Sequence, residues 1–107
     1  MELKQVYQIY ELLENYDNMK YRKIICHNMK KYRKELYDKY KEEYKRRGTE
    51  NPYSISNISA YLNVSDIYFR RLESENDKHK KINIDNLIKL SIILNKSLDD
   101  FLIEEKL

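Results

Sequence analysis

The sequence predicts a small all-α protein, and three observations lead to that prediction. The chain has 107 residues, which suits one domain and is too short for two of ordinary size. It contains one Gly and one Pro, whereas sandwiches and barrels need many turns built from these residues. Apolar residues recur every three or four positions along most of the chain, which is the period of an amphipathic helix.

The first expected helix covers residues 2–16. Leu3, Tyr10 and Leu13 lie at helical spacing, and further apolar residues widen their stripe. This face is broad for so short a helix. We therefore expect residues 1–19 to form an amphipathic element that packs on the domain, on a second copy of the chain, or on both.

A long helix is expected over residues 20–47, as the first element of a domain that covers residues 20–107. Its last three residues are basic, which suits the negative end of the helix dipole. Gly48 follows and can adopt the left-handed conformation that ends many helices. Pro52 then prevents the helix from continuing through the next loop.

Three short helices are expected after this loop, each opened by a residue whose side chain can cap a helix N-terminus. They cover residues 54–64, 66–74 and 84–94, and their capping residues are Ser54, Ser65 and Asn83. Asn95 suits the left-handed position after the third of them. A last helix, capped by Ser97, is expected to run from Leu98 to about Glu105.

Charge is unevenly distributed along the chain, whose net charge is +3. Residues 1–19 carry a net charge of −3, residues 20–53 carry +7, and residues 54–107 carry −1. A local basic segment of this kind is typical of proteins that bind a polyanion. Lys, Ile, Asn and Tyr are also abundant, and their AT-rich codons indicate an AT-rich bacterium, or a phage or plasmid within one, as the source.

Composition argues against several classes of protein. The single cysteine, Cys26, excludes an internal disulfide framework and a Cys-rich zinc site, and the two histidines lack a metal-binding spacing. No nucleophile–base arrangement or Gly-rich phosphate loop is present, so we expect neither an enzyme nor a cofactor. The apolar stretch Ile88–Leu94 is interrupted by polar residues, and no cationic start precedes an apolar run. A cytoplasmic protein without a membrane segment is therefore expected.

Residues 54–74 have the layout of a helix-turn-helix, with two short helices separated by a tight turn around residues 63–65. Ser59 and Ala60 are small enough to let the two helices cross closely. The run S-I-S-N-I-S-A-Y-L-N-V-S-D-I-Y-F-R-R-L-E resembles the helix-turn-helix of the phage-repressor-like (XRE-type) DNA-binding family. The downstream run I-N-I-D-N-L-I-K-L-S-I-I-L-N-K-S-L-D-D-F-L resembles the last two helices of that family, and N-M-K-K-Y-R-K-E resembles its first helix.

This resemblance covers roughly residues 24–103 and implies a five-helix repressor-like DNA-binding domain, to which residues 1–19 add an N-terminal helix. It places the second helix of the motif in the DNA major groove. The base-contacting residues that it implies are Ser65, Asp66, Ile67, Tyr68, Arg70 and Arg71. The phosphate-contacting residues that it implies are Ser54 and Ile55, through backbone amides at the helix start, and Lys78, Lys80 and Lys81. It also implies a buried structural ion pair between Arg33 and Glu73.

The chain departs from the family pattern at several positions. Ile55 replaces a Gln that braces phosphate in relatives, and Asn63 replaces the usual Gly of the turn. The segment between Arg33 and Ser54 is longer than usual, which we interpret as extra turns on the first helix followed by a loop.

The expected function is that of a homodimeric, sequence-specific regulator, most simply a repressor, on an inverted repeat of double-stranded DNA. Residues 1–19 and the extended helix 20–47 are the candidate dimer elements, since both are additional to the minimal fold. One alternative is a protein-binding module on the same fold, such as an antitoxin or an inhibitor of a host protein. Another is an accessory factor in plasmid transfer or partition.

Overall fold

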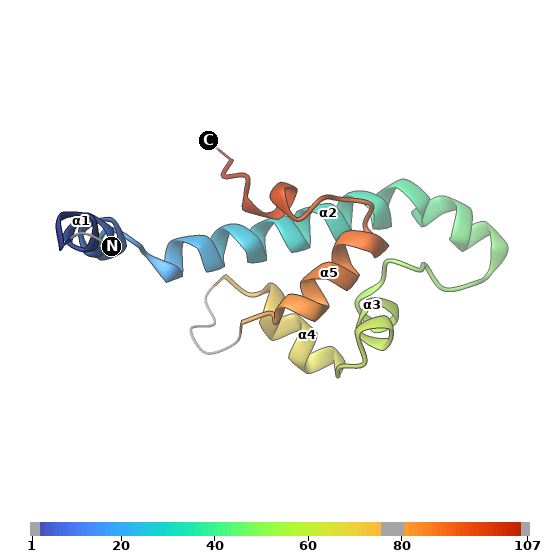
Figure 1. Ribbon diagram of the computed structural model, residues 1–107. Coiled ribbons are helices and arrows are strands. Elements are labelled where there is room, and N and C mark those ends of the chain that lie inside the picture. The colour runs from blue at the N-terminus through green and yellow to red at the C-terminus, as the bar shows by residue number, and fades with distance from the viewer. Residues whose placement is uncertain (1–2, 76–80, 106–107) are drawn as a thin grey trace.

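All regular structure in the computed structural model, which describes residues 3–75 and 81–105, is helical (Figure 1). It consists of five α-helices and one short 3-10 helix, with no strand in the described ranges, so the predicted all-α fold class is confirmed. The elements are α1 (Leu3–Glu14), α2 (Asn18–Arg47), α3 (Ile55–Leu62), α4 (Asp66–Glu73), α5 (Ile84–Ile93) and η1 (Asp99–Leu102). The molecule is elongated, at 64 × 26 × 25 Å, and α1 lies beyond one end of α2 (Figure 1).

Helix α2 is the longest element, with 30 residues that span about 45 Å. It begins two residues before the expected start because the carboxylate of Asp17 caps it, accepting the backbone N–H groups of Met19 and Lys20. Gly48 ends the helix in the left-handed conformation, with φ of 67°, as its sequence position predicts. The basic last turn of α2 projects beyond the rest of the domain (Figure 1).

Three of the four predicted N-terminal caps, those of α3, α4 and α5, are confirmed. Ser54, Ser65 and Asn83 each accept the backbone N–H three residues later, at donor–acceptor distances of 3.2, 3.1 and 2.8 Å. Asn63 and Asn95 both adopt positive φ, at 57° and 53°. Helices α3, α4 and α5 therefore begin and end within two residues of their expected bounds.

The core lies where α3, α4, α5 and η1 pack together on the first half of α2. Its most deeply buried side chains, each at most 2% exposed, are Met29, Ile58, Phe69, Leu72, Leu90, Leu94 and Phe101. Cys26 is buried beside them, and its thiol donates to the carbonyl of Leu72 at 3.0 Å. This core fixes α4 against α2 and leaves the opposite side of α4 in solvent.

The last expected helix is wrong in type and length. Instead of an α-helix from Leu98 to about Glu105, the chain forms the four-residue 3-10 helix η1. The physical reason is that side chains of α2 bond to the backbone carbonyl groups of this segment. The amide of Asn28 donates to the carbonyls of Phe101 and Ile103, at 2.8 and 2.9 Å, and the hydroxyl of Tyr32 donates to that of Asp100, at 2.7 Å. Side chains of α2 thus take acceptors that a longer α-helix would use.

Helix α1 stands apart from this core and buries none of its residues. The loop to α2 is held by Asp17 and by Tyr16, whose ring stacks on that of Tyr21 at a centroid distance of 5.8 Å. Within residues 3–75 and 81–105, no helix combines the length and the apolar character that a bilayer crossing requires.

Candidate nucleic-acid interface

Helices α3 and α4 form a helix-turn-helix whose turn is closed by backbone hydrogen bonds. The N–H of Val64 donates to the carbonyl of Ser59 at 3.0 Å, and the left-handed Asn63 reverses the chain between them. Ser59 is 1% exposed and its hydroxyl bonds back to the carbonyl of Ile55, so the two helices cross over a small side chain. Phe69 and Leu72 anchor α4 in the core. The motif is thereby held rigidly against α2.

The solvent-facing side of α4 carries most of the residues that the resemblance assigns to base contacts. Asp66, Ile67, Arg70 and Arg71 are exposed, and Ile67 is the most exposed large apolar residue of α4, at 74%. They occupy two successive turns of one short helix, so their side chains share one surface. We name this surface of four residues the α4 face.

The other two assigned base-contacting residues are partly used by the fold. Ser65 is exposed, but its hydroxyl oxygen accepts the N–H of Tyr68 as the cap of α4. Tyr68 is half-buried and packs against the core. Ser65 and Tyr68 therefore offer less side-chain surface for base contacts than the sequence alone suggests.

The assigned phosphate-contacting residues lie in two segments of the chain. Ser54 caps α3, and the side chain of Ile55 is partly buried against the core, so the polar group that Ile55 offers to a phosphate is its backbone N–H at the helix N-terminus. Lys81 is exposed just before α5. Lys78 and Lys80 lie outside the described residues.

Arg33 and Glu73 join α2 to the end of α4. The Arg33 Nε and Nη2 atoms donate to the two carboxylate oxygens of Glu73, at 2.8 and 3.1 Å. The side chains are 8% and 5% exposed, so the pair is buried. Arg33 also donates to the carbonyl of Tyr53, at 3.3 Å, and thereby links the loop before α3 to the same point. The structure thus brings together the two residues that the resemblance pairs.

A hollow of about 720 Å³ opens beside this ion pair, between α2 and α4. The exposed cations Lys30 and Lys34 line it from α2, and Arg70 lines it from α4. Ile55, at the start of α3, forms another part of the wall. Glu75, which is paired with His27, also lines the hollow, so exposed cations outnumber exposed carboxylates by three to one in its wall, and such a surface next to a helix N-terminus suits a phosphate backbone.

Lys30 and Lys34 are not among the phosphate-contacting residues expected from the sequence. A signal for them exists, because they lie three residues before and one after Arg33 on a predicted helix. Because Arg33 pairs with Glu73, that side of α2 must face α4. Lys30 and Lys34 lie on the same side of α2 and therefore also face α4.

Tyrosines brace the loop that leads into α3. The ring of Tyr40 stacks on Tyr53 at 6.0 Å and meets Tyr44 edge-on at 6.5 Å. Burial, and then the neighbouring Tyr40, raises the pKa of Tyr53, which keeps its hydroxyl neutral. The side chain of Asn51 donates to the carbonyl of Tyr37 at 2.9 Å and fixes the loop on α2. These contacts position the N-terminus of α3.

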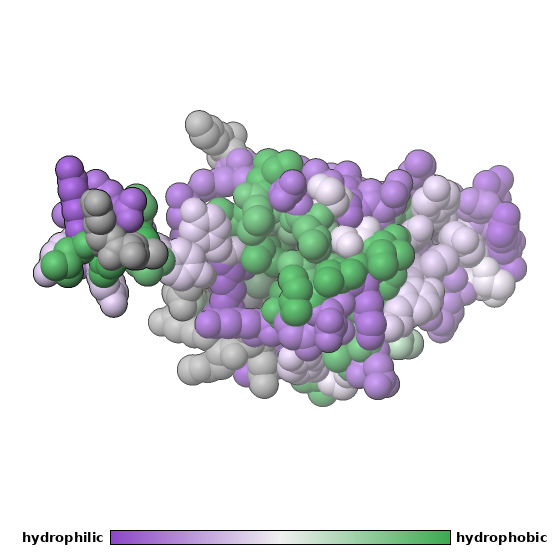
Figure 2. Space-filling model, in the orientation of Figure 1, coloured by the Kyte–Doolittle hydropathy of each residue, from purple (hydrophilic) through white to green (hydrophobic). Residues whose placement is uncertain are grey.

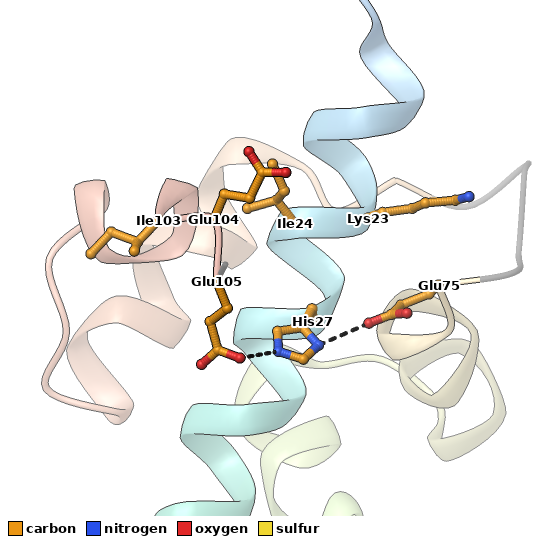
Figure 3. Close-up of a pocket in the computed structure, with 7 residues that line it drawn as sticks. All are labelled: Lys23, Ile24, His27, Glu75, Ile103, Glu104 and Glu105. Carbon is orange, nitrogen blue, oxygen red and sulfur yellow. Dashed lines mark hydrogen bonds and ion pairs between the residues drawn. The ribbon is translucent and has the colours of Figure 1, made fainter. Parts of the chain in front are cut away.

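His27 lies between two carboxylates at the end of the site. Its ring nitrogens are 3.0 Å from Glu75, which follows α4, and 3.0 Å from Glu105 in the C-terminal segment (Figure 3). Glu105 also pairs with Lys31. A small cavity of about 200 Å³ lies beside this cluster. The cluster ties the end of α4 and the C-terminal segment to α2.

Among the residues that the structure describes, no group of three or more His, Cys, Asp or Glu side chains could hold a metal ion. No protein-family model, curated protein sequence or solved structure matches this chain significantly. The arrangement of the residues themselves is therefore the basis of the proposal below.

Proposed function

We propose that this protein is a sequence-specific DNA-binding regulator of the phage-repressor-like (XRE-type) class, most simply a homodimeric repressor of a phage, plasmid or low-GC bacterial operon. The observation that carries the proposal is the α4 face. Asp66, Ile67, Arg70 and Arg71 stand in solvent on a helix whose inner side is fixed in the core by Phe69 and Leu72. A rigid helix with polar and cationic outer side chains suits the major groove of DNA.

The residues divide into two roles. In this proposal, exposed Arg71 forms a bidentate hydrogen bond with guanine, and exposed Ile67 contacts a thymine methyl group. Lys30, Lys34 and the N-terminus of α3 contact phosphates, which positions the motif on the duplex without reading sequence.

A single module of this size reads few base pairs. Two copies related by a two-fold axis read an inverted repeat and supply the missing selectivity. We therefore propose a homodimer as the active form.

The binding of a labelled random-sequence duplex, measured by fluorescence anisotropy from 50 to 300 mM salt, tests the electrostatic part of this proposal. We expect the logarithm of the association constant to fall linearly with that of the salt concentration, by about 0.9 for each phosphate neutralised. A protein that shows no binding even at the lowest salt concentration would contradict the proposal.

A second candidate function is a protein-binding module on the same fold, such as an antitoxin or an inhibitor of a host protein. The observation that favours it is the pairing of Ile67, 74% exposed, with the neighbouring carboxylate of Asp66, which repels phosphate. Such a protein would bind DNA weakly and without selectivity, and its α4 face would be protected from hydrogen exchange by a protein partner.

A further inference from the structure

Helix α1 exposes an apolar surface that a single chain does not cover. Leu3, Tyr7, Tyr10 and Leu13 lie along one side of the helix and are each between 60% and 71% exposed, and α1 buries none of its residues. A helix of 12 residues is marginal in water without tertiary packing. Its helical form therefore requires a surface against which this apolar side is buried.

Helix α5 presents a second uncovered apolar surface. Ile84, Ile88 and Ile92 lie four residues apart along one side of the helix and are 62%, 40% and 74% exposed. We name these three residues the Ile stripe. Leu98 and Ile103, in the C-terminal segment that follows α5, are also exposed, and Figure 2 shows apolar side chains gathered over this part of the molecule.

The connection between α1 and α2 directs α1 away from the Ile stripe of its own chain. Asp17 caps α2 through two backbone N–H groups, and Tyr16 stacks on Tyr21 with an interplanar angle of 17°. With this connection intact, α1 stands at the far end of the long axis, away from α5 (Figure 1). Folding α1 back onto its own domain would break the cap and the stack.

We propose that α1 of one chain packs on the Ile stripe of a second copy, and that the second copy returns the contact. The Ile stripe extends over about 12 Å and the apolar side of α1 over about 15 Å, so the two surfaces match in length. A two-fold axis uses both contacts at once and doubles the buried area. Stable interfaces bury roughly 800 Å² per partner, and the large exposed side chains of both surfaces provide an area of that order.

This inference deepens the homodimer part of the proposed function, and its test contains no DNA, so its failure would leave DNA binding untouched. The 107-residue chain that carries Tyr10→Cys is mixed with a size-tagged chain that carries Ile92→Cys, and the mixture is oxidised mildly. We expect a disulfide-linked product that contains one chain of each kind. The matched control replaces Tyr10→Cys by Gln8→Cys, which lies about 200° around α1 from Tyr10 and should give no such product.

Sedimentation equilibrium provides a second, independent readout. We expect Ile92→Lys to weaken the dimer at least tenfold, because it places a charge in the contact. Ile67→Lys is the matched control, since Ile67 on α4 has the same 74% exposure, and it should leave the dimer unchanged.

Four results would overturn the proposal. They are a monomeric wild-type chain, a disulfide between two Tyr10→Cys chains in preference to the mixed product, an intrachain disulfide in a chain that carries both Tyr10→Cys and Ile92→Cys, and an Ile92→Lys dimer as stable as the wild type. The second result would indicate pairing of α1 with α1, and the third would indicate packing within one chain.

Discussion

Arg33 Nε lies 2.8 Å from a carboxylate oxygen of Glu73, and this buried ion pair joins the long helix α2 to the end of α4. Removing one partner leaves a charge in the interior without a counter-charge, so Arg33→Met should lower the free energy of unfolding by about 3–5 kcal/mol. Urea unfolding measures this loss.

The double variant Arg33→Met with Glu73→Leu should recover most of that stability, because neither charge then remains buried. The exposed pair of Arg47 and Glu43, four residues apart on α2, is the matched control, and Arg47→Met should cost less than about 1 kcal/mol. Equal losses for Arg33→Met and Arg47→Met would show that the buried pair contributes no more to the free energy of unfolding than the exposed pair does.

Asn28 is 1% exposed, and its amide satisfies the carbonyls of Phe101 and Ile103. Asn28→Ala removes the donor and leaves these carbonyl acceptors unpaired beside the space that the amide had filled. We therefore expect the free energy of unfolding, measured in urea, to fall by about 1–3 kcal/mol. Asn15→Ala, at an exposed position just after α1, is the control and should change stability by less than about 0.5 kcal/mol. An Asn28→Ala protein with wild-type stability would rule out this amide as the anchor of the C-terminal segment.

Asp100 should make stability depend on acid pH. The backbone N–H of Ser97, and then its hydroxyl, hold the pKa of Asp100 below its ordinary value of 3.8. A carboxyl whose pKa is lower in the folded state stabilises the fold above its unfolded pKa, and this contribution disappears as the pH falls through the folded pKa. The wild type should therefore exceed Asp100→Asn in stability at neutral pH, with the difference shrinking below about pH 4. Urea unfolding of both proteins between pH 2.5 and 7 measures this difference, and a constant difference would refute the assignment.

Base-reading and phosphate-contacting residues should respond differently to substitution. Arg71→Ala should weaken binding to the selected sequence and relax its base preference at one position, with a loss of about 1–3 kcal/mol. Lys30→Ala should weaken binding to every duplex and reduce the salt slope by about 1. Anisotropy titrations against selected and random duplexes separate the two effects.

The control for Lys30→Ala is Lys39→Ala, which removes the same charge about 180° around α2 and should leave the salt slope unchanged. An equal loss on all sequences for Arg71→Ala would exclude it from base reading.

Much of this fold follows from local chemistry. Ser54, Ser65 and Asn83 cap helices because a short side-chain oxygen can reach the N–H three residues on, and their spacing is visible in the sequence. Asn63 adopts positive φ because Asn tolerates that conformation better than most residues. The α4 face could be predicted because the apolar residues Phe69 and Leu72 define the opposite side of the helix.

Features that depend on distant residues could not be predicted in this way. The length of η1 is set by Asn28 and Tyr32, which lie about 70 positions earlier in the chain. The approach of Lys30 and Lys34 to Arg70 depends on how α2 packs against α4, which periodicity alone does not determine. Lys30 and Lys34 therefore belong to the candidate interface because of where they lie beside Arg70, which their residue type does not reveal.

Selection of bound duplexes from a random DNA pool at near-physiological salt, followed by sequencing, would show whether this protein reads DNA sequence. We expect an enriched inverted repeat, with half-sites about one helical turn apart, and loss of that enrichment in Arg71→Ala. A pool with no enriched sequence would contradict the assignment of a sequence-specific DNA-binding regulator.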